Sequence, residues 1–99
     1  MDARTIYETI CLEQMQAQDT GEPTHFMMKN ENGIMAQGFI YENVVSLNLM
    51  TGVYVRFEFT RMELDMDGEG YIYLFNPTEY GRGYMGMIAC GEITSFEVD

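Results

Sequence analysis

Apolar and polar positions along the chain follow two different periods, and the change of period divides the sequence into two regions. Near the start, apolar side chains recur about every 3.6 residues, as they do on one face of a helix. Thr5 and Glu8 fit a capping box, and Gly21 followed by Pro23 is typical of a helix end. The pattern predicts a helix over about residues 5–19. The side chains expected on its buried face are Ala3, Ile6, Tyr7, Ile10, Cys11 and Met15.

After Pro23 the apolar positions alternate, which is typical of strands with one face in water. Asn30–Gly33 has the composition of a hairpin turn, with Gly where a positive φ is needed. Thr51-Gly52 and Asp67–Gly70 predict two further chain reversals. The region from about residue 24 to residue 99 is therefore expected to be rich in β-structure. The expected strands are 25–29, 34–41, 45–49, 53–59 and 71–75, with one or two closing strands from 84–90 and 93–98.

One irregularity in this alternation predicts a bend. From Val53 to Phe59 the apolar side chains of the alternation occupy odd-numbered positions, but they occupy even-numbered positions at Met62, Leu64 and Met66. A strand cannot change face without an extra residue, so a bulge or sharp bend is expected near Thr60-Arg61. Such bends let one long strand serve two sheets, or curl a sheet toward a barrel.

These elements predict one α+β domain over residues 1–99, since 99 residues are close to the usual size of a single core. We expect the N-terminal helix to pack on a strongly curved antiparallel sheet of about six or seven strands. Closure of that sheet into a small barrel is left open by the sequence.

Composition and charge limit what the domain can bind. Hydrophobic residues make up 46% of the chain, so it is expected to fold, yet sixteen acids face five Lys and Arg residues. The net charge of −11 argues against direct contact with nucleic acid or an anionic membrane, whose phosphates attract cations. The charge instead favours a basic protein partner.

The same sequence favours a cytoplasmic location. The N-terminal residues show no basic stretch followed by an apolar run, so no signal peptide is expected, and no apolar run is long enough to span a bilayer. Cys11 and Cys90 are interpreted as two buried thiols in a reducing compartment, with a single disulfide bridge as the alternative.

Two short motifs resemble ligand sites but lack the residues that those sites need. Asp65–Ile72 resembles a calcium-binding EF-hand loop, yet Asn76 stands where the closing Glu should be, and the flanks alternate as strands. An acidic hairpin turn is the favoured interpretation. Gly81–Gly86 matches the dinucleotide-binding glycine pattern, but the 13 residues after it form no helix pattern.

Catalytic and metal-binding chemistry has little support in the sequence. His25 is the sole histidine, so any histidine-dependent catalysis must use it. Cys11, Cys90 and His25 lack the short spacing of zinc ligands. We therefore expect a protein that is not an enzyme and that uses no metal or other cofactor.

The remaining candidate site combines acids with tyrosines. Tyr71, Tyr73 and Phe75 are expected on one face of a strand, with Ile72 and Leu74 on the other. Tyrosines are enriched at protein interfaces because the ring buries area while the hydroxyl keeps a hydrogen bond. The alternative is that these rings pack internally and the acids only confer solubility. The predicted partner-binding residues are Glu58, Glu63, Asp65, Asp67, Glu69, Tyr71, Tyr73, Tyr80 and Tyr84.

These features favour a non-catalytic protein-binding module that occupies the basic, nucleic-acid-binding surface of its target. Nucleases, RNA-guided effectors and DNA-binding regulators carry such surfaces. In size and charge the chain is similar to phage-encoded anti-defence proteins, such as anti-CRISPR inhibitors, and to immunity proteins that neutralise nuclease toxins. The alternative is a self-associating structural or accessory β-domain with a homo-oligomer interface of tyrosines and methionines.

Overall fold

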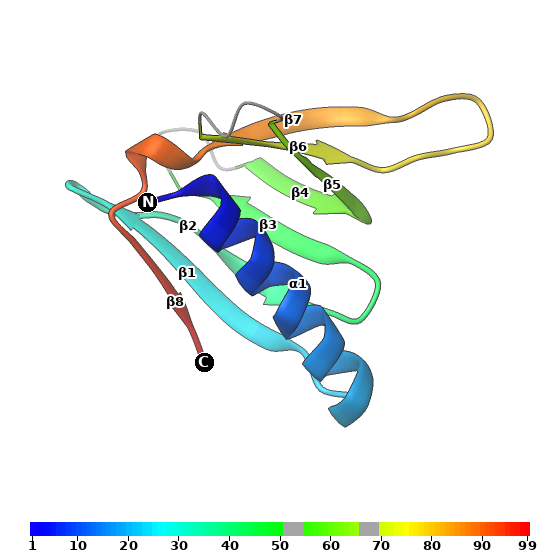
Figure 1. Ribbon diagram of the computed structural model, residues 1–99, viewed down its shortest axis with the longest axis horizontal. Coiled ribbons are helices and arrows are strands. Elements are labelled where there is room, and N and C mark those ends of the chain that lie inside the picture. The colour runs from blue at the N-terminus through cyan, green and yellow to red at the C-terminus, as the bar shows by residue number, and fades with distance from the viewer. Residues whose placement is uncertain (51–54, 66–69) are drawn as a thin grey trace.

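A computed structural model describes residues 1–50, 55–65 and 70–99, and Figure 1 shows one helix followed by antiparallel strands. The predicted turn at Thr51-Gly52, together with Met66, Asp67 and Glu69, lies outside the described residues. The elements are α1 (Ala3–Thr20), β1 (Thr24–Asn30), β2 (Gly33–Ile40), β3 (Val45–Leu49), β4 (Val55–Phe59), β5 (Arg61–Leu64), β6 (Tyr71–Phe75), β7 (Tyr84–Ala89), the short 3-10 helix η1 (Cys90–Glu92) and β8 (Ser95–Val98).

Helix α1 begins earlier than the capping-box pattern predicts. Asp2 is the N-cap, and its carboxylate accepts a hydrogen bond from the backbone N–H of Arg4 at 3.0 Å. The predicted cap at Thr5 is wrong, because Asp2 already satisfies a free N–H and lets the helix include Ala3. The predicted end is confirmed: Gly21 has φ 75°, and its N–H donates to the Ala17 carbonyl at 2.8 Å.

The buried face of α1 also differs from the prediction at one end. Ile6 and Ile10 are fully buried, but Met15 is 63% exposed, and Ala17 is buried in its place. At about 100° per residue, position 17 lies about 20° from position 10 around the helix axis, whereas position 15 lies about 140° away. The helix therefore continues the buried stripe through Ala17 and leaves Met15 in water.

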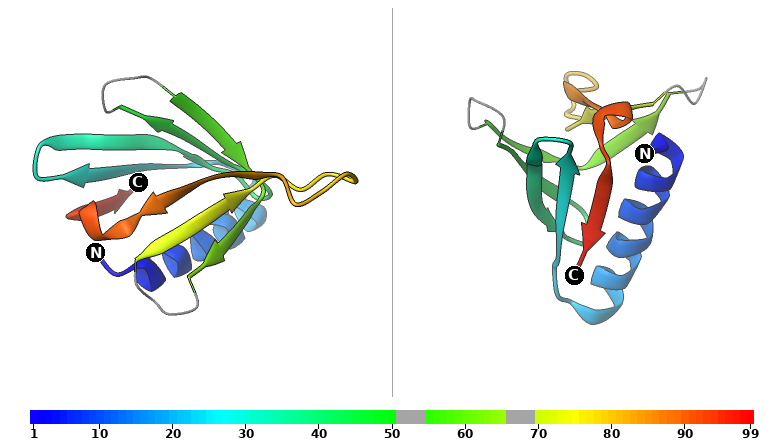
Figure 2. Two further views of the ribbon diagram at one scale, coloured as in Figure 1. Left: turned by 90° about the horizontal axis from the view of Figure 1, so that it is seen from above. Right: turned by 90° about the vertical axis from the view of Figure 1, so that its left-hand side faces the viewer.

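The strands form two antiparallel sheets, so the predicted single curved sheet of six or seven strands is wrong, and the barrel is not closed. Sheet A has the order β4-β3-β2-β1-β8, and sheet B has the order β5-β6-β7. The α+β class is confirmed. In Figure 2 the strands of the two sheets fan apart from the point where β4 leads into β5.

The change of face predicted near Thr60-Arg61 is the corner between the two sheets. Phe59 ends β4 and is 1% exposed, Thr60 forms a bend, and β5 begins at once with exposed Arg61. The backbone N–H of Thr60 donates to the Phe75 carbonyl at 3.1 Å, which ties the corner to β6. One chain segment thereby serves both sheets, as the shift in alternation predicts.

Helix α1 and both sheets share one hydrophobic core. The predicted hairpin between β1 and β2 is confirmed: Asn30 pairs with Gly33, which has φ 119°. In the middle of β2, a Cβ on Gly38 would lie 1.8 Å from the Ser46 carbonyl oxygen, so only Gly allows this approach of β3. The largest fully buried side chains are Phe26, Phe59, Ile6, Ile10, Met28, Ile40, Leu47, Ile72, Leu74, Ile93, Val45 and Cys90.

Candidate functional site

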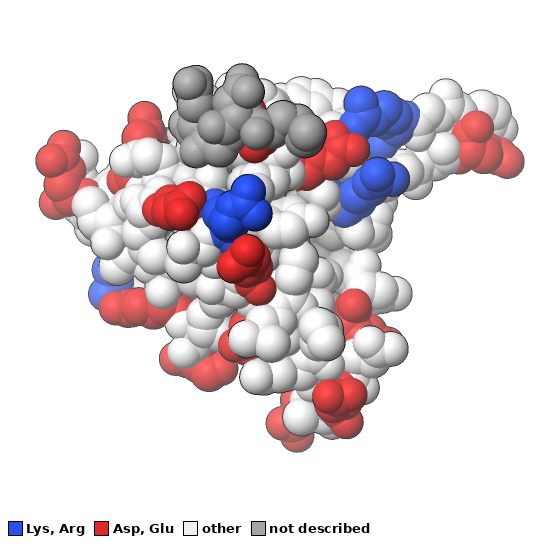
Figure 3. Space-filling model, in the orientation of Figure 1, with Lys and Arg blue, Asp and Glu red and all other residues white. Residues whose placement is uncertain are grey.

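The acids of the chain are distributed over several elements. Figure 3 shows carboxylates scattered over one face of the molecule, both near its centre and at its periphery, and not gathered in a single patch. Lys29 pairs with Glu97 at 3.4 Å, and Arg56 pairs with Glu58 at 2.7 Å. Glu58 lies on sheet A in one row with Ser46 and the exposed Phe39, and its own side chain is exposed. It is therefore separated from the tyrosines of sheet B with which the sequence groups it.

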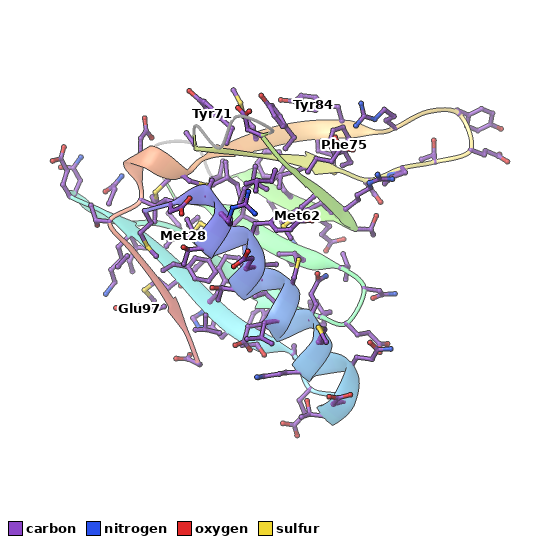
Figure 4. The ribbon with its side chains drawn as sticks, in the orientation of Figure 1. Met28, Met62, Tyr71, Phe75, Tyr84 and Glu97 are labelled. Carbon is purple, nitrogen blue, oxygen red and sulfur yellow. The ribbon has the colours of Figure 1, made fainter. Side chains whose placement is uncertain are left out.

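The predicted tyrosines lie on the outer face of sheet B. Ile72 and Leu74 of β6 are buried, while Tyr71 is exposed and Tyr73 half-buried. Figure 4 shows Tyr71 and Tyr84 projecting from the side of sheet B opposite to Met62, which points toward the core. We call this surface the tyrosine face and define it by Tyr71, Tyr73, Phe75 and Tyr84.

Aromatic contacts order the centre of the tyrosine face. The ring of Tyr84 lies 5.7 Å from that of Phe75, edge to face, and 6.4 Å from that of Tyr73. The Arg82 guanidinium carbon lies 4.5 Å above the Phe75 ring, in cation–π geometry. Phe75 is only 6% exposed and forms the floor of the face, whereas Tyr71 and Tyr84 are 37% and 58% exposed. The two exposed tyrosines are the side chains that a partner could contact.

Glu63, which the sequence assigns to an acidic surface, lies between two arginines. Its carboxylate pairs with Arg61 at 3.5 Å and also accepts a hydrogen bond from Arg82. Since Glu63 pairs with Tyr73 in register, this cluster lies on the same side of sheet B as the tyrosine face. The cluster carries a formal charge of +1, because two guanidinium groups surround one carboxylate.

The other end of β5 leads to the acidic segment. The backbone N–H of Asp65 donates to the Tyr71 carbonyl at 3.1 Å, so Asp65 lies beside Tyr71. Gly70 follows the acidic segment with φ 103°. Asp67 and Glu69 lie outside the described residues. The sequence prediction that Asp65 and Tyr71 belong to one surface is therefore compatible with their positions.

A loop at the far end of β6 carries Tyr80, which is 91% exposed. Thr78 and Gly81 hold the loop in a tight reversal through two backbone hydrogen bonds of 3.0 and 3.3 Å. Figure 1 shows this loop extending beyond the rest of sheet B. At the base of the loop, Arg61, Phe75 and other residues line an open hollow of about 380 Å³. Tyr80 is well separated along the sheet from Tyr71.

The two thiols and the histidine differ in their burial and contacts. Burial raises the pKa of the Cys90 thiol to about 11, and burial is also the main cause of the raised pKa of Cys11. Both cysteines are free, and Cys11 is only partly buried. His25 Nδ1 lies 3.0 Å from an Asp99 carboxylate oxygen, and its ring packs edge to face on Phe39 at 5.3 Å.

Two further observations concern the described part of the chain. Within residues 1–50, 55–65 and 70–99, no three side chains of His, Cys, Asp or Glu are placed to hold a metal ion. No helix in these ranges combines the length and apolar composition required to cross a membrane.

Sequence reasoning missed a second aromatic surface, on the outer face of sheet A. The rings of Phe39 and Tyr41 lie 6.4 Å apart, and these side chains are 43% and 38% exposed. His25 pairs with Phe39 in register and adds its ring to the row. The signal was present in the alternation of strand 34–41, where Phe39 and Tyr41 share a face opposite Ile40.

Comparison with known proteins does not supply a family. The chain matches no protein-family model, and searches of curated proteins and of solved structures find no match either.

Proposed function

We propose that this protein is a non-catalytic binding module that uses the tyrosine face to occupy a cationic, nucleic-acid-binding surface of another protein. Bound there, the module blocks access of nucleic acid to its target and so acts as an inhibitor. The observation that carries the proposal is the exposure of Tyr71 and Tyr84, at 37% and 58%, on a sheet whose opposite face packs against the core.

The geometry of the tyrosine face supports a contact role. Tyr84 packs against both Tyr73 and Phe75, so two ring contacts restrict its side chain before any partner arrives. Side chains ordered in advance lose less conformational entropy on binding, and tyrosine is enriched among residues that dominate interface energies. A rigid aromatic surface is therefore better suited to recognition than isolated exposed rings.

The net charge of −11 supports a basic partner. Glu58 and Glu63 are each paired with arginine, so they are poorly placed to act as phosphate mimics. We assign the acids as a group to long-range steering, which raises the association rate with a cationic surface and weakens as salt increases. The tyrosines supply the contact area after encounter.

The test uses affinity capture from lysates of the native cell, with the wild-type protein and two tyrosine variants as bait. Tyr71→Ala removes an exposed ring from the tyrosine face. Tyr41→Ala is the matched control, since Tyr41 is 38% exposed but follows β2 of sheet A, away from sheet B. We expect a basic, nucleic-acid-binding protein to be retained by wild type and by Tyr41→Ala, and about tenfold less by Tyr71→Ala.

Two additions make the result specific. Added duplex DNA should release the captured protein, since both compete for one cationic surface, and raised salt should also release it. Equal capture by Tyr71→Ala and Tyr41→Ala would show that the tyrosine face makes no contact. Retention that is indifferent to DNA would show that the partner is held elsewhere than at its nucleic-acid site.

A further inference from the structure

Strand β7 ends sheet B with an edge that no described strand covers. The sheet order β5-β6-β7 leaves one side of β7 without a hydrogen-bonded neighbour among residues 1–50, 55–65 and 70–99. An uncovered edge presents unpaired N–H and C=O groups, which makes it a template for another strand. The edge of β7 is therefore a candidate interaction surface separate from the tyrosine face.

The hydrogen-bond pattern identifies the groups on that edge. The backbone N–H of Cys90 donates to the Gly70 carbonyl at 2.6 Å, and Ile88 pairs with Ile72 in register. The register of β6 with β7 shifts between Leu74 and Phe75, and from Gly86 to Cys90 the residues at even positions bond to β6, because antiparallel pairs alternate. The N–H and C=O groups of Met87 and Ala89 then point to the free edge.

The side chains of β7 lack the features that normally protect an edge strand. Natural edges are blunted with charged residues or proline, yet the six residues Tyr84–Ala89 contain neither. Met87 is 54% exposed on this strand. The nearest charges in sequence are Arg82 before the strand and Glu92 after it. An uncharged edge strand of this kind is more stable when another strand pairs with it than when it is exposed to water.

An apolar cleft lies beside the same edge. Its volume is about 220 Å³, and it lies between sheet A and β7. Leu47 and Phe57 line the sheet A side, while Met87, Ile88 and Ala89 line the β7 side. Apolar surface next to an unpaired strand increases the free energy gained when the edge is covered.

We propose that two copies of this chain pair through β7, antiparallel and about a two-fold axis near Met87, to give one continuous sheet from two copies of sheet B. Antiparallel pairing brings the Arg82 end of each strand beside the Glu92 end of the other, which makes the edge complementary to itself in charge. The strand Tyr84–Ala89 itself contributes no acid to the seam. Neighbouring strands of one sheet place paired side chains on the same face, so the two tyrosine faces form one doubled surface.

The response to added salt distinguishes this dimer from the proposed partner binding. Two chains of charge −11 repel, and this net repulsion outweighs the attraction between the Arg82 and Glu92 ends of the two strands. Screening by added salt should therefore strengthen the dimer, whereas it should weaken the complex with a basic protein. The dimer does not depend on the proposed function. Tyr71→Ala should reduce partner capture while the dimer persists, and a monomeric wild type would leave the capture result unaffected.

The test measures the mass of the full chain by light scattering across a dilution series, at low and high salt. We expect the mass to approach twice the 11.4 kDa of one chain as concentration rises. Met87→Lys places two like charges across the axis and should weaken the dimer by more than about tenfold. Met15→Lys is the matched control, since Met15 is a methionine that is 63% exposed on α1, and it should dimerise as wild type does.

Amide hydrogen exchange of the wild-type protein gives a readout that needs no variant. The amides of Met87 and Ala89 should exchange slowly in the dimer and quickly on dilution, because they donate across the seam. A wild type that stays monomeric at every concentration would overturn the proposal. A dimer whose Met87 and Ala89 amides exchange quickly, or a folded Met87→Lys that dimerises as wild type does, would equally overturn it.

Discussion

Gly38→Ala should be among the most damaging single-methyl additions in this protein. Gly38 pairs with Leu47 of β3 on one side and with Phe26 of β1 on the other, so it lies in the middle of sheet A. A Cβ built at this position would lie 1.8 Å from the carbonyl oxygen of Ser46 and 2.9 Å from its carbonyl carbon. Both atoms belong to the backbone and cannot move by a change of rotamer.

The loss in the free energy of unfolding depends on how far β3 must move away from β2. Real Cβ atoms almost never approach a heavy atom closer than 3.0 Å, so the oxygen at 1.8 Å must move by at least the difference, 1.2 Å. A displacement of that size breaks one or two ladder hydrogen bonds, each worth about 1 kcal/mol, and overpacking adds about 1–3 kcal/mol. We expect a loss of about 3 kcal/mol in the free energy of unfolding, out of about 5–15 kcal/mol for a typical domain.

Urea unfolding of the two proteins measures this loss directly, and a thermal scan should show a fall in Tm of about 4–8 °C per kcal/mol. Gly81→Ala is the matched control, because a Cβ at Gly81 meets no atom within 4 Å and the residue has no positive φ. It should change stability by less than about 0.5 kcal/mol. A Gly38→Ala protein as stable as the Gly81→Ala protein would refute the close approach of β2 and β3.

Two further predictions concern charge and ionisation. The pKa of the Cys90 thiol rises from 9.0 to about 11 on burial, so the unfolded chain ionises first and stability should fall as the pH rises from about 9 to 11. The fall should be smaller in Cys90→Ala, measured by urea midpoints at several pH values, and identical slopes would contradict the assignment. Arg82→Ala should cost about 0.5–1 kcal/mol through loss of the Glu63 pair and the Phe75 contact. Arg82→Lys should recover only the salt-sensitive part, and the same cost at low and high salt for both variants would contradict it.

The elements with strong local signals were predictable from sequence. Gly21 and the turn at Asn30–Gly33 require backbone conformations that few residues adopt, so their composition alone identified a helix end and a hairpin. The shift in alternation at Thr60 predicted a bend for a comparable reason, because side-chain parity is a rigid property of a strand. The helix start was missed because Thr5 and Asp2 are both good caps, and tertiary packing of Ala3 decides between them.

The sheet arrangement depended on information that alternation does not contain. Each strand was identified by its own pattern, yet pairing β8 with β1 joins residues near opposite ends of the chain. A pattern of period two states which side chains share a face but not which strand is the neighbour. The prediction of one curved sheet therefore counted most of the strands and missed their division into two sheets.

The candidate site was predictable in part for the same reason. The outward direction of Tyr71 and Tyr73 follows from the buried Ile72 and Leu74 around them. The partners of Glu63 did not follow, because Arg82 reaches it from a loop 19 residues later in the chain. Composition alone shows the excess of acids, but the arginines that neutralise Glu63 can be identified only from the three-dimensional structure.

The position of sheet B in the chain has an evolutionary consequence. Residues 61–89 form the whole sheet in one uninterrupted stretch, leaving sheet A at Thr60 and returning to it through η1. Within β5, β6 and β7, outward positions alternate with core positions, so codons for exposed outward side chains such as Tyr71 and Met87 can mutate without altering a buried side chain. A short gene segment could thus acquire new binding preferences by drift or recombination, while the rest of the scaffold is inherited unchanged.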